Sequence, residues 1–170
     1  MLILKCTQKV TKALGLRHAA LPHLPAENNQ TLLGDWFVNA LRFGPTKILL
    51  FTNAQTLYSL LVEYKKKDLT DVGQLFRTGL KTNLLAEGVA AEKVTALLTQ
   101  YQQVVLAQTD SRSVLGSMND LASIYKYWMM ARGGFKQTDL AEAMREINRT
   151  PQLKRNGHYS IDLLRAALRG

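Results

Sequence analysis

The most suggestive polar residues lie in one short stretch, TDSRSVLGSMND, at positions 109–120. Asp110 or Ser111 can cap a helix that begins here, because a side-chain oxygen at this position accepts a hydrogen bond from a first-turn N–H group. A cap does not explain Arg112, since a cation in the first turn opposes the helix dipole. Free N–H groups beside the forked guanidinium would make a site for a phosphate or a carboxylate. The stretch therefore predicts a helix start that can also bind an anion.

The two faces of this helix, expected over 111–131, differ in character. With successive residues about 100° apart, an apolar seam faces the core. Its members are Val114, Met118, Leu121, Tyr125 and Trp128. The opposite face carries Arg112, Gly116, Asn119, Ser123 and Lys126. Such a face is most simply solvated surface, but Gly116 also permits the close approach of a ligand or partner. Both interpretations stay open.

Asn39 poses a second question, because it falls in a strand pattern, DWFVNALRF, at 35–43. Alternation places it on the same face as Phe37 and Phe43, which is the more apolar face. A buried amide without a partner costs about 1–3 kcal/mol, so Asn39 bonds either a neighbouring loop or a ligand. Asn53, at the exit of the next strand, is most simply a turn residue.

Most catalytic templates are missing from the sequence. GPTK at 44–47 lacks the first half of a glycine-rich phosphate loop, and no nucleophile elbow occurs. Cys6, His18 and His23 match no common zinc-site spacing, so we expect no metal and no cofactor. His158 lies near hydroxyl and basic groups and is the best candidate for a general acid or base. Whether the chain is an enzyme stays open.

The charge balance favours anionic partners. The 170 residues include 22 lysines and arginines against 13 aspartates and glutamates, a net charge of +9. Nucleic acid or an acidic protein would fit such a surface, although an excess of bases can also serve solubility alone. The single cysteine, Cys6, favours a reducing cytoplasm. No apolar run approaches the ~20 residues of a membrane span, so we expect no membrane association.

The order of hydrophobic patterns predicts one α+β domain over 1–170. Strands are expected at 1–6, 35–43, 47–53, 57–64 and 104–108, and helices at 7–15, 68–88, 90–102, 111–131, 138–149 and from Ser160. The short links GPT and AQT favour hairpins between three consecutive strands, and 17–34 reads as a long loop. We expect a four- to five-stranded, mainly antiparallel sheet packed with helices that are concentrated in the C-terminal half.

Several short motifs occur along the chain: Cys6-Thr7 with Lys9, Trp36-x-x-Asn39, Asn53-x-x-Thr56, and Asp110 with Arg112-Ser113 followed by Asn119. Together they resemble an uncharacterised bacterial family of short proteins, a domain of unknown function. The chain departs from the family pattern where Gln8 precedes Lys9 and where Ser111 separates Asp110 from Arg112. The resemblance implies no activity, but it singles out candidate binding residues. These are Thr7, Lys9, Trp36, Asn39, Asn53, Thr56, Arg112, Ser113 and Asn119.

Two functional hypotheses follow. The first is a non-enzymatic binding module, carried by a bacterium, phage or plasmid, that engages nucleic acid or an acidic protein partner through its basic surface. The second is a small metal-independent ribonuclease or toxin-like enzyme with a pocket around Asn39 and Arg112. The pocket hypothesis requires that Asn39, Asn53, Arg112 and Asn119 converge in one cleft.

Overall fold

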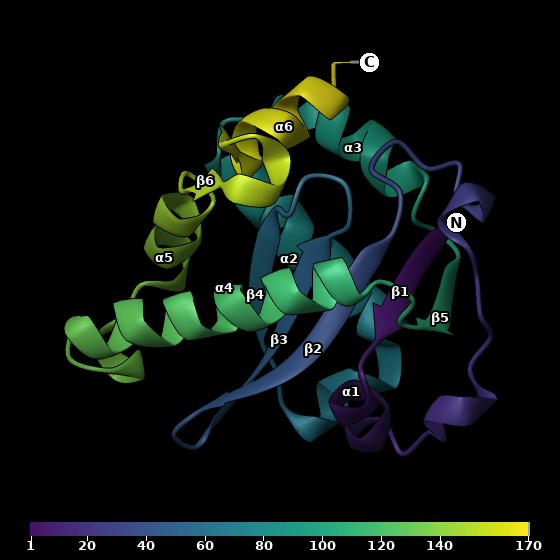
Figure 1. Ribbon diagram of the computed structural model, residues 1–170, viewed down its shortest axis with the longest axis horizontal. Helices are drawn as coiled ribbons and strands as arrows, with labels where there is room; N and C mark the ends of the chain where they lie inside the picture. Colours follow the sequence, from purple (N-terminus) through teal and green to yellow (C-terminus); the bar gives the residue numbers. More distant parts are fainter. Residues whose placement is uncertain (170) are drawn as a thin grey trace.

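A five-stranded sheet with helices on both faces forms the centre of the protein, as seen in a computed structural model that describes residues 1–169 (Figure 1). The strands are β1 (Leu2–Cys6), β2 (Trp36–Phe43), β3 (Thr46–Asn53), β4 (Ser59–Glu63) and β5 (Val104–Gln108). They lie in the order β4-β3-β2-β1-β5. The structure is a single α+β domain, which is the class that the sequence predicts.

The directions of the strands correct the expected topology. β2, β3 and β4 form the predicted antiparallel meander, but β1 lies parallel to both β2 and β5. The sheet is therefore mixed, and the prediction of a mainly antiparallel sheet is wrong. Strand composition indicates which segments are extended but not how they pair. The connections at 7–35 and 64–103 are long enough for crossovers that return the chain in the same direction.

Residues 1–169 contain six α-helices, and the longest begins where the sequence predicts it. They are α1 (Gln8–Ala13), α2 (Val72–Ala86), α3 (Ala91–Thr99), α4 (Arg112–Ala131), α5 (Leu140–Ile147) and α6 (Ser160–Ala167). Ser111 is the N-cap of α4, and its Oγ accepts a hydrogen bond from Val114 N (3.2 Å). A short two-stranded ladder, β6 (Pro151–Gln152) and β7 (His158–Tyr159), precedes α6 and is absent from the sequence-based prediction. Within residues 1–169, no helix combines the length and the apolar character needed to cross a membrane.

Helices α2 and α4 cover opposite faces of the sheet, with α4 crossing in front of it in Figure 1 and α2 behind. On the α2 face, the ring of Trp36 meets that of Phe76 edge-on, with 4.9 Å between centroids. On the α4 face, Val114 and Met118 pack against Phe37. Burying a large apolar side chain stabilises a fold by about 1.5–3 kcal/mol, so these contacts hold both helices on the sheet.

A buried ion cluster joins β1, the residue before β2 and the lead-in to α4. Lys5 Nζ lies 2.7 Å from Asp35 Oδ2, as an ion pair whose angles fall outside hydrogen-bond geometry, and it also donates to the Asp110 carboxylate. The side chains of Lys5 and Asp35 are each 1% exposed, whereas that of Asp110 is 35% exposed. Asn29 Nδ2 donates to the other Asp35 oxygen (2.6 Å). Each buried charge therefore has a partner, as burial in a low-dielectric interior requires.

Removing the cation from this cluster should destabilise the protein. We expect Lys5→Met to lower the free energy of unfolding by about 3 kcal/mol, because Asp35 then stays buried without its ion-pair partner. Urea denaturation followed by circular dichroism measures the loss. The control is Lys81→Met, which changes an exposed lysine on α2 and should alter stability by less than about 0.5 kcal/mol. Equal midpoints for the two variants would show that the cluster does not hold β1 in place.

Candidate functional site

Thr7 and Asn39 lie together at the carboxyl end of β1. Thr7 Oγ1 donates to Asn39 Oδ1 (3.0 Å), and the backbone N–H of Ala40 donates to the same oxygen (2.9 Å). Asn39 is buried and shares the α4 face of β2 with Phe37. These two bonds account for the buried amide oxygen of Asn39 within the protein itself.

Asn53 organises the turn between β3 and β4. Its Nδ2 donates to the backbone oxygens of Leu33 (2.7 Å) and Asp35 (3.3 Å), and its Oδ1 accepts bonds from both N and Oγ1 of Thr56 (3.0 Å each). The turn contains Leu57, whose N–H donates to the backbone oxygen of Asn53 (3.0 Å). Its backbone is left-handed, with φ 58°, a conformation that is uncommon for residues other than glycine. Asn53 and Thr56 are both buried, so their side chains are occupied in holding the turn.

The four polar residues of the pocket hypothesis do not share one cleft. Asn53 pairs with Trp36 and therefore shares the α2 face, whereas Asn39, which pairs with Leu50, points to the α4 face. Trp36 is itself part of the core, where its Nε1 donates to the hydroxyl of Tyr101 (3.1 Å). A pocket around Asn39 and Arg112 alone stays a prediction.

Four other sequence candidates belong to α4. Arg112, Ser113 and Asn119 are exposed there, while Gly116 is half-buried. A Cβ atom at Gly116 would lie 3.4 Å from Lys154 Nζ, which donates to the backbone oxygen of Ser113 (3.0 Å). This distance is an ordinary van der Waals contact, so Lys154 of the same molecule lies beside Gly116 without requiring a glycine there.

The residues considered for metal binding do not form a ligand set. In the part of the chain that the structure describes, no three histidine, cysteine or carboxylate side chains lie close enough to share an ion. Cys6 is buried, and burial raises the pKa of its thiol to about 12. The thiol is therefore protonated at neutral pH and is a poor nucleophile. His158, in β7, is exposed.

A groove opens where the β2–β3 hairpin extends beyond the helices that cover the rest of the sheet. Burial decreases along β2 toward the hairpin and increases again along β3 away from it. Arg42 and Lys47 pair across the two strands at this end, on the α2 face. Helix α1 and the 3-10 segment η3 (Lys66–Asp71) contribute the other walls, and the groove has a volume of about 760 Å³.

The lining of this groove, which we call the basic groove, includes five cations. They are Lys9 and Lys12 from α1, Arg42 from β2, Lys47 from β3 and Lys66 from η3. No aspartate or glutamate of residues 1–169 lines the basic groove, and none of the ion pairs found in that range includes one of its cations. Unpaired charges of one sign on a shared surface repel each other, and an anion between them relieves the repulsion. The basic groove is therefore suited to an anion that carries several charges.

Tyr64 adds a neutral donor to the basic groove. Burial raises the pKa of the Tyr64 phenol, and the positive charge of Arg42 lowers it in part. The phenol consequently stays protonated at neutral pH. Its hydroxyl can donate a hydrogen bond to an anionic oxygen without changing the charge of the site.

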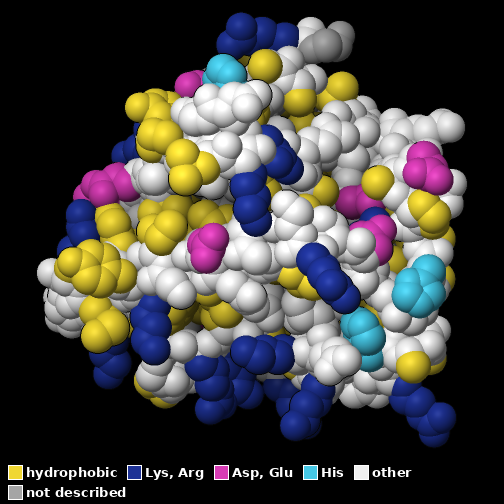
Figure 2. Space-filling model, in the orientation of Figure 1, with side chains coloured by type: hydrophobic (Ala, Val, Ile, Leu, Met, Phe, Trp, Pro, Cys, Tyr) yellow, Lys and Arg dark blue, Asp and Glu magenta, His cyan; other side chains and the backbone are white. Residues whose placement is uncertain are grey.

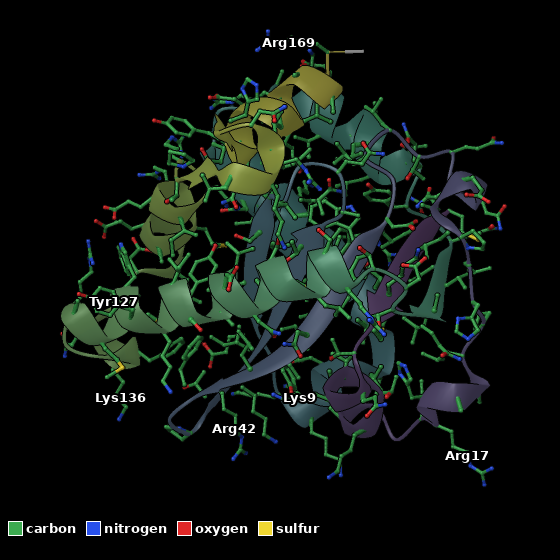
Figure 3. All side chains as sticks on the ribbon, viewed as in Figure 1. Lys9, Arg17, Arg42, Tyr127, Lys136 and Arg169 are labelled. Atoms are coloured by element: carbon green, nitrogen blue, oxygen red, sulfur yellow. The ribbon has the colours of Figure 1, made fainter. Side chains whose placement is uncertain are left out.

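The basic groove is part of a longer positive band on the surface. Figure 2 shows lysine and arginine side chains gathered along the lower edge of the molecule, below the sheet. In Figure 3, Lys136, Arg42 and Lys9 follow one another along this edge, and Arg17 lies further on, beyond α1. The band therefore offers positive charge to a ligand longer than the basic groove itself.

Of the five cations, only Lys9 is among the candidate binding residues that the sequence indicates. The five come from α1, the β2–β3 hairpin and η3, which are far apart in the chain, so no local motif contains them all. A partial signal was present, because Arg42 and Lys47 flank the predicted hairpin and face each other once its strands pair. The position of α1 and η3 beside that pair depends on the tertiary structure.

Comparison with known proteins places the chain in a family. The match to the family described as Domain of unknown function (DUF6933) covers residues 3–163, which reach from β1 into α6. No curated protein matches the chain. The resemblance inferred from the short motifs, to a family without an assigned activity, is thus confirmed. The protein with this mixed sheet and basic groove belongs to the family Domain of unknown function (DUF6933).

Proposed function

We propose that the protein is a non-enzymatic binding module that engages nucleic acid through the basic groove. The observation that carries the proposal is the gathering of five cations in one groove of about 760 Å³ that has no carboxylate in its described lining. Phosphate groups supply regularly spaced negative charge, and lysine and arginine side chains that neutralise them release bound counterions. This release provides affinity for nucleic acid of any sequence.

The extent of the positive surface favours nucleic acid over an acidic protein. Arg42 lines both the basic groove and a neighbouring hollow, where Lys126 and Lys136 contribute further charge. A track of this kind matches the uniform charge of a phosphate backbone better than the scattered carboxylates of a protein surface. A cytoplasmic location, which the single cysteine favours, and an origin in a bacterium, phage or plasmid belong to the same proposal.

Neutralising the basic groove should weaken the binding of nucleic acid. We expect the triple variant Lys9→Gln, Arg42→Gln and Lys47→Gln to bind a fluorescein-labelled single strand at least about tenfold more weakly at low salt, because three phosphate contacts are lost. Fluorescence anisotropy measures the affinity, and circular dichroism confirms that the variant is folded.

The matched control removes three exposed cations elsewhere on the surface. Lys81→Gln, Lys93→Gln and Arg145→Gln together change the net charge by the same amount, and none of these residues lines the basic groove. Near-wild-type affinity in the control localises binding to the groove. Equal losses in both triple variants, or tighter binding of poly-glutamate than of nucleic acid, would contradict the proposal.

The salt dependence of binding should report the number of phosphates neutralised. Five contacts to a single strand predict that log K falls with log salt at a slope of about −3.5, and the groove variant, with two contacts left, should give about −1.4. Titrations over a series of potassium chloride concentrations measure both slopes. A slope near zero for the wild-type protein would show that phosphate neutralisation does not drive binding.

A further inference from the structure

A second hollow lies on the other side of the β2–β3 hairpin, against the end of α4. It has a volume of about 470 Å³, which lies within the range of about 300–1,000 Å³ found for pockets that hold small organic groups. Its lining combines apolar side chains with cations. Among the lining residues are Arg42, Phe43, Lys126, Met130, Phe135 and Lys136. We call it the aromatic hollow.

The apolar part of this hollow is built around two aromatic rings. Phe43 and Phe135 lie nearly parallel, with 12° between their planes and 6.2 Å between their centroids. Both side chains are half-buried rather than enclosed. Met130, which also lines the hollow, is 67% exposed, and its flexible thioether adapts readily to a flat partner. These side chains present a surface suited to a planar aromatic group.

The cations around this surface restrict the kind of group that fits. Arg42, Lys126 and Lys136 line the hollow together with the aromatic pair, and no carboxylate of residues 1–169 lines it. An apolar side chain of a protein partner would use the aromatic surface but leave the positive charges of Lys126 and Lys136 without a counterpart. A nucleotide fits both the aromatic surface and the cations, because its base has an aromatic face and its phosphate carries negative charge.

Arg42 connects the aromatic hollow with the basic groove, because this residue is part of the lining of both. Alternation along β2 directs Arg42 to the α2 face and Phe43 to the α4 face. The end of the hairpin therefore has cations on one side and an aromatic ring on the other. A chain of nucleotides that follows the basic groove would reach the hollow at this end.

We propose that the aromatic hollow receives an unpaired base of a single-stranded nucleic acid whose phosphates lie in the basic groove. This inference rests on the proposed function and specifies its ligand. A paired base in a duplex is stacked between its neighbours and does not expose its face to a protein ring, whereas a base in a single strand does. The hollow thus selects single strands, while the basic groove supplies binding without sequence preference.

The experiment compares three ligands of equal length. These are a labelled single strand, the same strand annealed to its complement, and a strand of abasic sites that keeps the phosphates but lacks bases. Anisotropy titrations should show that the wild-type protein binds the intact single strand about tenfold more tightly than the abasic strand or the duplex, as expected for the stacking of at least one base.

Phe135→Leu tests the role of the aromatic ring, because leucine keeps apolar volume in the hollow but cannot stack on a base. The variant should lose about tenfold in affinity for the intact strand and bind the abasic strand like wild type. The control is Tyr127→Leu, which removes an aromatic ring that is 77% exposed on α4 and does not line the hollow. It should retain the preference for the intact strand.

The outcomes separate this inference from the proposed function. Equal binding of the intact strand, the abasic strand and the duplex would overturn the inference and leave nucleic-acid binding by the basic groove intact. A nucleoside monophosphate that binds as tightly as the strand would show that the occupant is a free nucleotide, and it would also overturn the inference. Failure of all the nucleic acids to bind would overturn the proposed function itself.

Discussion

The buried ammonium of Lys5 fixes the arrangement on which the other features depend. It lies on the central part of the sheet between the carboxylates of Asp35 and Asp110, which belong to separate segments of the chain. A charge that is almost fully excluded from water is strongly unfavourable unless its partners are held in place. The three segments therefore have to meet at one point. That requirement positions β1 beside β2 and sets the start of α4 against the sheet.

The candidate sites arise from the unequal lengths of the strands. β2 and β3 have eight residues each, whereas β1, β4 and β5 have five. The shared end of the two long strands extends beyond the helical cover, and its side chains become progressively more exposed toward the hairpin. Polar and charged residues are stable there because water can reach them. The basic groove and the aromatic hollow flank this end, and Arg42 contributes to both.

The polar residues that attract attention in the sequence mostly serve the fold. The side chain of Asn53 bonds to five backbone or hydroxyl groups, three of them in the β3–β4 turn, and Asn39 accepts bonds from Thr7 and Ala40. Lys154 of the same chain lies beside Gly116. A buried polar side chain must be satisfied whether or not a ligand exists. Its presence in an apolar pattern therefore indicates that it has a partner, but not whether that partner is part of the protein.

Local patterns in the sequence determined the main extended and helical segments, the α+β class, the antiparallel meander and the start of α4, with either Asp110 or Ser111 as its cap. These features depend on alternation, helical periodicity and capping, which neighbouring residues specify. Only the tertiary structure decided that β1 runs parallel to β2 and β5 and that Lys5 lies between two aspartates. It also decided that lysines from α1 and η3 lie beside Arg42 and Lys47. Contacts between segments distant in the chain depend on how whole layers pack, and no short stretch of sequence contains that information.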